Sequence, residues 1–156
     1  MTFGYNFNRY IKDRIPNKLT HLTLGHNFSL YINGSMRNSV THLTLNGKNN
    51  ENLFDNDFTP KLVTHLTFGD DFNQPISHLR YIPKSITHLT FGNYFNPDIS
   101  SIRTIPNTVT HLTFGVNFNQ DISADGIIPS SVKQLTISNN YNRKLPYNDK
   151  IFIIRI

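Results

Sequence analysis

A chain of 156 residues is long enough to bury a sizeable core, so we expect one domain over residues 1–156. It contains no cysteine, which excludes disulfide frameworks, thiolate zinc sites and cysteine nucleophiles. The formal net charge is +5, yet residues 1–50 hold six Lys and Arg against one acid, residues 51–100 hold three against six, and residues 101–156 hold six against three. A polyanion lying along the chain would cross the acidic middle, so nucleic acid is an unfavoured partner.

The sequence shows no signal for a membrane. Its first residues contain no basic stretch followed by an apolar run, and no part of it approaches the ~18 consecutive apolar residues that cross a bilayer. We therefore expect no contact with membranes and a cytoplasmic location.

A seven-residue motif recurs along the chain. At residues 86–92 it reads Ile-Thr-His-Leu-Thr-Phe-Gly, and the central leucines of successive copies are 21, 23, 23, 23 and 23 residues apart. The copies occupy residues 19–25, 40–46, 63–69, 86–92 and 109–115, with a looser copy at 132–138 and the second half of one at 1–4. Such a period is typical of a leucine-rich solenoid, in which each repeat is one coil that buries its apolar edge against its neighbours.

Within each motif, apolar residues alternate with Thr and His, which is the pattern of a half-buried strand. Leu22 and Leu24 are expected to point into the coil, whereas His21 and Thr23 point outward. Strands of successive coils would lie side by side at ~4.8 Å. We therefore predict a leucine-rich-repeat-like solenoid that is mainly β, with a parallel sheet of about six or seven short strands, turn-rich or extended return arms, and little helix.

The rest of each coil is also constant. A glycine follows most strands (Gly25, Gly69, Gly92 and Gly115), and we expect it to adopt a positive φ that other residues resist. An aromatic residue expected in the core comes next, beside an Asn expected to bond backbone groups of the turn. These pairs are Phe7-Asn8, Phe28-Ser29, Phe72-Asn73, Phe95-Asn96, Phe118-Asn119 and Tyr141-Asn142. An Ile-Pro pair then predicts a return arm that is not helical.

The run Ile-Pro-x-Ser-Val-Thr-His-Leu-Thr-Phe-Gly-x-x-Phe-Asn-x-x-Ile, repeated over nearly the whole chain, resembles the FNIP repeat. This family is a leucine-rich-repeat variant found in proteins of amoebae and very large DNA viruses. The resemblance implies a curved or flattened solenoid used for protein interaction, joined in some members to an F-box or a kinase domain. Neither of those domains is recognised in the 156 residues. A viral origin would imply the host cytoplasm or the virion as the location.

One turn breaks the pattern. It contains Asn46, Lys48, Asn49, Asn50, Glu51 and Asn52, and Asn49 stands where the core aromatic is expected. Either Phe54 or Phe58 fills the vacated space, or the turn projects outward as an Asn-rich loop that could hold a ligand. Loops are the usual location of both structural variation and ligand sites. We favour structural variation here.

The two ends of the chain differ. Residues 145–156 finish in a run too apolar for a loose tail, which predicts a last strand that caps the solenoid. The beginning offers no such cap. Because an uncapped end exposes a core cross-section and an unpaired strand edge, we expect a homodimer or a larger assembly through that end.

Two outward columns are the sharpest candidates for chemistry. They consist of His21, His42, His65, His88 and His111, beside Thr23, Thr44, Thr67, Thr90 and Thr113. Histidine is a common metal ligand and proton carrier, but a flat row does not close around one ion and no acid or Cys alternates with it. We expect a structural ladder, with a partner-binding face as the alternative, and no metal or cofactor. Protonation would put like charges side by side, so stability should fall below pH ~6.5.

Repetition also argues against catalysis. Each His has the same neighbours, which is the opposite of a single asymmetric site, and no nucleophile elbow or phosphate-binding glycine loop is present. The sequence therefore predicts a non-catalytic protein-interaction or assembly module. The alternative is a nucleic-acid-binding protein that uses its basic ends.

Overall fold

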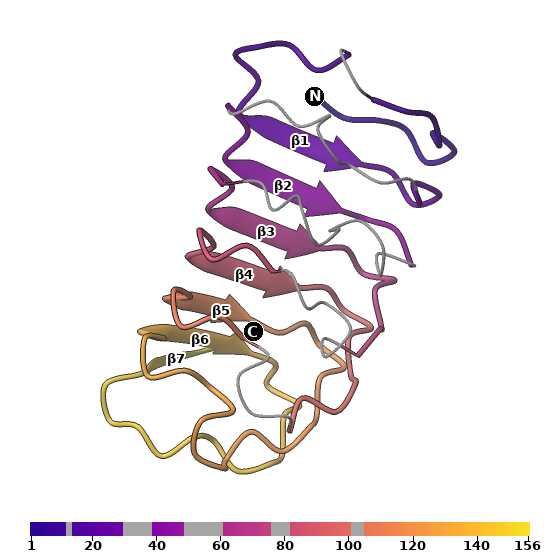
Figure 1. Cartoon of the computed structure of the whole chain (residues 1–156). Coiled ribbons are helices and arrows are strands. Elements are labelled where there is room, and N and C mark those ends of the chain that lie inside the picture. The colour runs from indigo at the N-terminus through magenta and orange to yellow at the C-terminus, as the bar shows by residue number, and fades with distance from the viewer. Residues whose placement is uncertain (12–13, 30–38, 49–60, 76–81, 101–104) are drawn as a thin grey trace.

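The computed structural model describes residues 1–11, 14–29, 39–48, 61–75, 82–100 and 105–156. These residues form one sheet of parallel strands that lie side by side in chain order, with no helix in the described ranges (Figure 1). The strands are β1 (His21–Leu24), β2 (His42–Leu45), β3 (His65–Phe68), β4 (His88–Phe91), β5 (His111–Thr113), β6 (Gln134–Ile137) and β7 (Phe152–Arg155). The predicted solenoid with a parallel sheet of short strands is confirmed.

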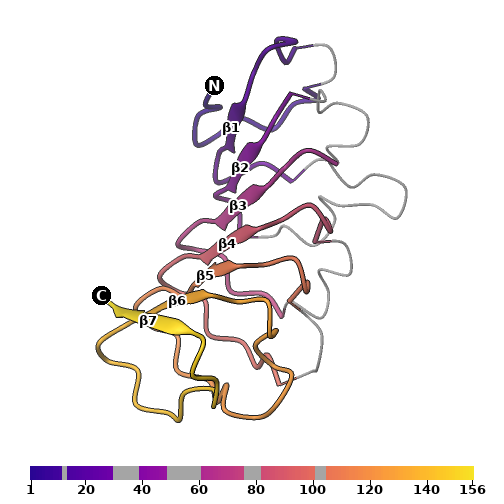
Figure 2. The same ribbon diagram turned by 90° about the vertical axis from the view of Figure 1, so that its left-hand side faces the viewer.

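Each strand pairs with the next so that equal positions of the repeat face each other. His21 lies opposite His42, and Leu22 opposite Leu43, and the same register continues to β5. Along a strand the two leucine-type positions are buried, while His and Thr face outward. Figure 2 shows the successive strands stacked one above another along the array. The period-two alternation of the motif therefore sets which side chains form the core and which form the strand face.

Aromatic rings form a continuous stack inside the coils. Phe72, Phe95 and Phe118 are fully buried, and their ring centroids follow one another at 5.9 and 6.0 Å. Phe118 is followed by Tyr141 at 6.2 Å. A buried side chain of this size stabilises the fold by ~1.5–3 kcal/mol. The turn aromatic is therefore a core residue, as predicted, from Phe28 to Tyr141, whereas Phe7 in the first coil is half-buried.

The reason for the glycines is different from the one predicted. Among the described glycines, only Gly126 has a positive φ, of 84°. The glycines that follow the strands are instead required by the close stacking of coils, since a Cβ on Gly92 would lie 2.5 Å from the backbone of Gly69. The turn itself is closed by a backbone bond in which Phe95 N–H donates to the carbonyl of Gly92 at 3.3 Å. The predicted positive φ was wrong because Gly92 is the first residue of the observed turn, and a β-turn does not require a positive φ at its first residue.

The recurring asparagines join neighbouring coils. The side-chain oxygen of Asn73 accepts the backbone N–H of Asn96 at 2.9 Å, and that of Asn96 accepts the N–H of Asn119 at 2.9 Å. Asn thus bonds a backbone group, as predicted, but that group belongs to the next coil and not to its own turn. Proline closes the return arm, since the N–H of Ile86 donates to the carbonyl of Pro83 at 3.1 Å. The described parts of the return arms are thus turns and extended segments.

The ends of the array are unequal. At the beginning, Thr2 forms a single bridge with Thr23, and the N–H of Phe3 donates to the carbonyl of Thr23 at 2.9 Å. At the other end, β7 pairs with β6 over four residues, and Nη1 of Arg155 donates to the carbonyl of Ser138 at 2.9 Å. The beginning therefore adds one bridge to the sheet, whereas residues 152–155 add a full strand.

Candidate interaction surface

The outward histidines form one stacked column across β1 to β5. The centroids of successive rings lie 4.0, 4.0, 4.0 and 4.2 Å apart, with interplanar angles between 9° and 16°. His21 is exposed and the other four are half-buried. The column continues as Gln134 in β6 and as Phe152 in β7, where the side chain is 68% exposed. The strand face thus presents a continuous row made of the edges of stacked imidazoles.

A threonine directly before each histidine holds the imidazole ring in place. Oγ1 of Thr87 lies 2.9 Å from Nδ1 of His88, and the same contact at the same distance is made by Thr20, Thr41, Thr64 and Thr110 with the histidine that follows each of them. This contact was not predicted, although the Thr-His pair is visible in every copy of the motif. The signal was the pair itself, which recurs in every copy that contains the histidine, with the threonine directly before the first residue of the strand.

The environment of the column disfavours charged imidazole. Partial burial lowers the pKa of His42, His65 and His88 below the ordinary value, and the positive charges that neighbouring imidazoles would carry lower each pKa further. The stacked rings are nearly parallel, so their nitrogen lone pairs do not converge on one point. In the described part of the chain, no group of three His, Cys, Asp or Glu residues is arranged to hold a metal ion.

The outward threonines lie beside the histidines on the same face. Thr23, Thr44, Thr67, Thr90 and Thr113 are all half-buried and paired in register along the sheet. Thr136 of β6 continues the column and is 9% exposed. The structure therefore brings both predicted columns together as one uncharged surface over five strands.

The irregular turn after β2 is described only in part. Asn46 is half-buried against Gly69, and Lys48 is exposed. Asn49, Asn50, Glu51 and Asn52, together with Phe54 and Phe58, lie outside the described residues. Beside this turn, Nδ1 of His26 lies 2.9 Å from Oδ2 of Asp71, two coils away, and the His26 ring stacks on Tyr5 at 4.6 Å.

The contact of His26 with Asp71 was not predicted, because it skips the coil whose turn is irregular. Tyr5 and His26 share the position directly after the glycine, so their stacking could have been found from the repeat alignment. His26 lines two cavities, of about 390 and 360 Å³. A third, of about 400 Å³, lies near the C-terminal end and is lined in part by Ile128, Pro129 and Tyr147.

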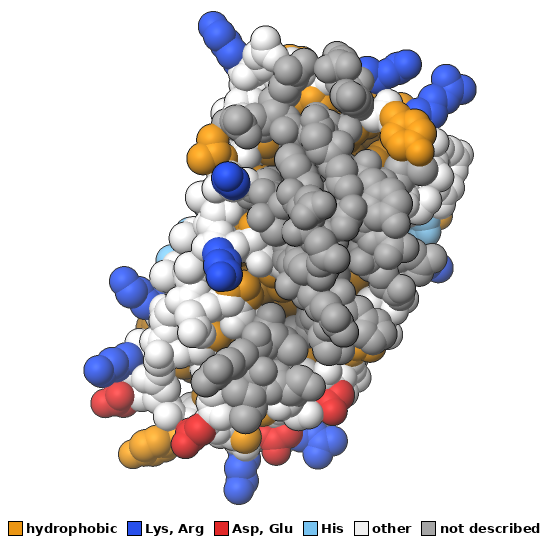
Figure 3. Space-filling model, viewed as in Figure 1, with side chains coloured by type: hydrophobic (Ala, Val, Ile, Leu, Met, Phe, Trp, Pro, Cys, Tyr) orange, Lys and Arg blue, Asp and Glu red, His pale blue; other side chains and the backbone are white. Residues whose placement is uncertain are grey.

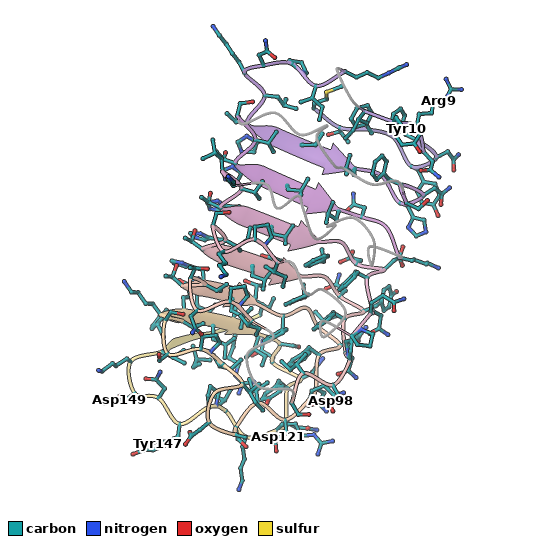
Figure 4. The ribbon with its side chains drawn as sticks, in the orientation of Figure 1. Arg9, Tyr10, Asp98, Asp121, Tyr147 and Asp149 are labelled. Carbon is teal, nitrogen blue, oxygen red and sulfur yellow. The ribbon has the colours of Figure 1, made fainter. Side chains whose placement is uncertain are left out.

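Carboxylates gather on parts of the coils other than the strand face. Asp98 accepts the N–H of Ser100 at 2.7 Å, and Asp121 accepts the N–H of Ser123 at 2.8 Å. These hydrogen bonds lower the pKa of both carboxyl groups. Figure 4 shows both at the lower end of the molecule, and shows Arg9 and Tyr10 projecting from the opposite end.

In the described part of the chain, no helix is long and apolar enough to cross a membrane.

Comparison with known proteins agrees with this architecture. The FNIP Repeat family matches residues 50–94, 72–115 and 101–140, which together are more than half of the chain. A crystal structure of CroV588, described as a novel circular LRR protein structure, is similar with a TM-score of 0.58 and 33% sequence identity. The match covers 99% of this chain and 29% of that one, so the chain spans less than a third of the length of CroV588. No curated protein matches the sequence.

Proposed function

Because the chain belongs to the FNIP repeat family and has a leucine-rich-repeat-like fold, we propose that it is a non-catalytic protein-interaction or assembly module. The observation that carries the proposal is the strand face, where two outward columns run without a charged residue across five strands. A flat and regular face of this kind offers many equal contacts to a macromolecule and no concave pocket to a small substrate.

The repeated geometry supports a role without catalysis. Every histidine of the column has a threonine at Nδ1, and the three inner ones each lie between two imidazoles, so none of these three is set apart as an acid or a base. The columns His21 to His111 and Thr23 to Thr113 are the proposed contact residues.

A partner-capture experiment tests this function. The wild-type chain and the variant Thr67→Arg/Thr90→Arg, which places two charges in the middle of the face, are immobilised and exposed to lysate under equal conditions. The control Tyr94→Arg/Val116→Arg adds the same charge at exposed positions in the turns after β4 and β5. We expect a saturable partner that the wild type and the control retain and the face variant loses. A partner retained by the face variant, or no saturable partner at all, would contradict the proposal.

A second contact surface is the end of the array beyond β1. There the aromatic stack ends in Phe3 and Phe7, whose rings are stacked at 4.2 Å and only half-buried. We propose that this end takes part in homodimers or larger assemblies, because a half-buried aromatic end and an unpaired sheet edge both gain from being covered. Light scattering over a micromolar concentration series tests it. Monomer at every concentration would exclude assembly of this chain through that end.

A further inference from the structure

Hydrogen bonds on one carbonyl oxygen decide where the protons of the histidine column lie. The carbonyl oxygen of Thr64 accepts the backbone N–H of Thr87 at 2.9 Å and that of His88 at 3.0 Å. Oγ1 of Thr87 is 3.3 Å from the same oxygen and 2.9 Å from Nδ1 of His88. A carbonyl oxygen has two lone pairs, and both are already used by N–H donors. The Thr87 hydroxyl is within hydrogen-bonding distance of both acceptors, and we infer that its one proton is donated to Nδ1, which is the shorter contact.

The same arrangement occurs in the other coils. The carbonyl oxygens of Thr20, Thr41 and Thr87 each accept two backbone N–H groups from the next coil, while the hydroxyl of the next threonine stands 3.2–3.4 Å away. A neutral imidazole with an acceptor at Nδ1 carries its proton on Nε2. His42, His65, His88 and His111 therefore share one tautomer.

The strand face is consequently a row of N–H donors. Nδ1 is occupied by the threonine, and Nε2 points its hydrogen outward, so neither nitrogen offers a free lone pair to a metal ion. The donors follow one another at the strand spacing of ~4.8 Å. A partner that replaces water at this row has to supply oxygen acceptors.

Lysines lie on the margin of the sheet where the strands begin. This lysine margin consists of the exposed residues Lys18, Lys61, Lys84, Lys133 and Lys150, each within the four residues before the first residue of a strand. In Figure 3, several blue side chains lie on the left side of the molecule, some at its edge and two on the face turned to the viewer; the arrows of Figure 1 begin on this side. Among the described residues, Asp149 is the carboxylate that shares this margin.

The described acids of the middle of the chain lie elsewhere. Asp70 and Asp71 follow β3 at the end of the strand, and the carboxylate of Asp70 accepts the N–H of Asn93 at 3.0 Å. In the coil of β3, Lys61 thus precedes the strand and Asp70 and Asp71 follow it, a separation that the count along the chain does not show. A segment lying over the strand starts would meet lysines and imidazole N–H groups without crossing these acids.

We propose that the strand face binds an acidic, extended protein segment that crosses the strands near their first residues. Its Asp and Glu carboxylates accept the Nε2–H of the histidine column and pair with the lysine margin. This inference rests on the proposed interaction function and adds the chemistry of the partner. Hydrogen bonds from N–H groups to carboxylates are charge-assisted, and long-range attraction by the lysines speeds the encounter.

Single-stranded nucleic acid is the less favoured polyanion. Proteins that bind it stack bases on exposed aromatic faces. Here the faces of the imidazoles are covered by one another, at centroid distances of 4.0 to 4.2 Å, and only the ring edges point outward. The exposed aromatic side chain in line with the column is Phe152, at one end of it.

Fluorescence anisotropy with a labelled oligo-glutamate peptide tests the proposal. A peptide of about ten residues, at ~3.3 Å each, is long enough to pass over all five histidines. The variant Lys61→Gln/Lys84→Gln removes two charges from the margin, and Arg143→Gln/Lys144→Gln removes two exposed charges from a turn outside it. We expect the first to weaken binding by ~10-fold or more and the second by less than ~3-fold, although both lower the net charge equally.

A second pair of variants tests the donors. His65→Phe/His88→Phe removes two N–H groups with a residue that the column already holds at Phe152, and His65→Gln/His88→Gln keeps N–H donors with the residue held at Gln134. We expect the Phe variant to lose affinity by ~10-fold and the Gln variant to stay within ~3-fold. Thermal melts of both variants show whether the fold is intact.

Three results would overturn the inference. The first is an equal loss of affinity in Lys61→Gln/Lys84→Gln and Arg143→Gln/Lys144→Gln. The second is equal affinity of the Phe and Gln variants. The third is an oligothymidine of the same length that binds as tightly as oligo-glutamate. If oligo-glutamate does not bind while Thr67→Arg/Thr90→Arg still abolishes capture of a cellular partner, the acidic partner is excluded and the interaction module stands. If both experiments fail, both proposals are wrong.

Discussion

Nδ1 of His88 lies 2.9 Å from Oγ1 of Thr87, the residue directly before it in the chain. The carbonyl oxygen of Thr64 is also within reach of that hydroxyl, but it already accepts two backbone N–H groups. With the hydroxyl proton assigned to Nδ1 as inferred above, His88 is neutral with its proton on Nε2, and the lone pair to which a second proton would bind is already used.

Long-range proton-nitrogen NMR spectra should show this tautomer directly. We expect His42, His65, His88 and His111 each to give the pattern of neutral imidazole protonated on Nε2 at pH 7.5. Thr87→Val removes the hydroxyl but keeps the β-branched shape, so it should cost ~1 kcal/mol of unfolding free energy. It should also raise the pKa of His88, because the neutral ring loses its hydrogen-bond donor.

The matched control for Thr87→Val is Thr90→Val in the same strand. Thr90 belongs to the neighbouring outward column and does not hold the ring of His88. Its replacement should leave the tautomer and the pKa of His88 unchanged. An Nδ1-protonated ring in the wild type would contradict the assignment of the hydroxyl proton.

The unfolding free energy should decrease as the pH falls below ~6.5, the ordinary pKa of histidine. Burial and neighbouring imidazoles lower the pKa of His42, His65 and His88 in the folded chain. Between the folded and unfolded pKa values the unfolded chain binds more protons, so stability rises with pH in that window. The stability that the neutral histidines contribute is fully present above pH ~6.5, and it is lost as the pH drops toward the lowered pKa values of the folded chain.

Thermal melts between pH 7.5 and 5.5 measure this dependence. His65→Gln/His88→Gln removes two of the titrating groups from the middle of the column and should flatten the profile. A wild-type melting temperature that stays constant over the range would show that the stacked rings do not oppose protonation.

Much of the fold could be predicted because one pattern is repeated. The alternation around Leu22 and Leu24 determines which residues are buried, and equal spacing brings His21 opposite His42. The role of the glycines could not be found in the same way. It depends on how closely the backbones of two coils approach, which no residue type in the motif expresses.

The candidate surface was predicted in part. Both outward columns were found, but the Thr87 hydroxyl and the lysine margin were not, because each depends on where the turn before a strand places its side chains. In the count along the chain, the charges of Lys61 and Lys84 cancel those of Asp70 and Asp71. In the structure the lysines precede two strands and the acids follow one, so the two kinds of charge lie at different positions in the coil. The position within the coil is therefore a better coordinate for charge than the position along the chain.

Truncation of the aromatic stack should be costly. Phe95 is fully buried, and the centroid of its ring lies 5.9 Å from that of Phe72 and 6.0 Å from that of Phe118. Phe95→Ala should lower the unfolding free energy by ~3–5 kcal/mol, since it leaves a cavity in the middle of the stack. Its neighbour Tyr94 is 58% exposed, so Tyr94→Ala should cost less than ~1 kcal/mol. Denaturant titration compares the two, and similar losses would mean that the stack does not dominate the core.

The glycine positions offer the sharpest test of coil stacking. A Cβ on Gly92 would lie 2.5 Å from the backbone of Gly69 and 2.6 Å from Cα of Asp70, whereas a Cβ on Gly4 would meet nothing within 4 Å. Gly92→Ala should therefore force two coils apart and cost more than ~2 kcal/mol, as overpacking against rigid backbone does. Gly4→Ala should change stability by less than ~1 kcal/mol. Since neither glycine has a positive φ, the difference reports the distance between coils alone. Equal effects in denaturant titrations would show that the coils can separate at no cost, and that the close stacking does not hold the array together.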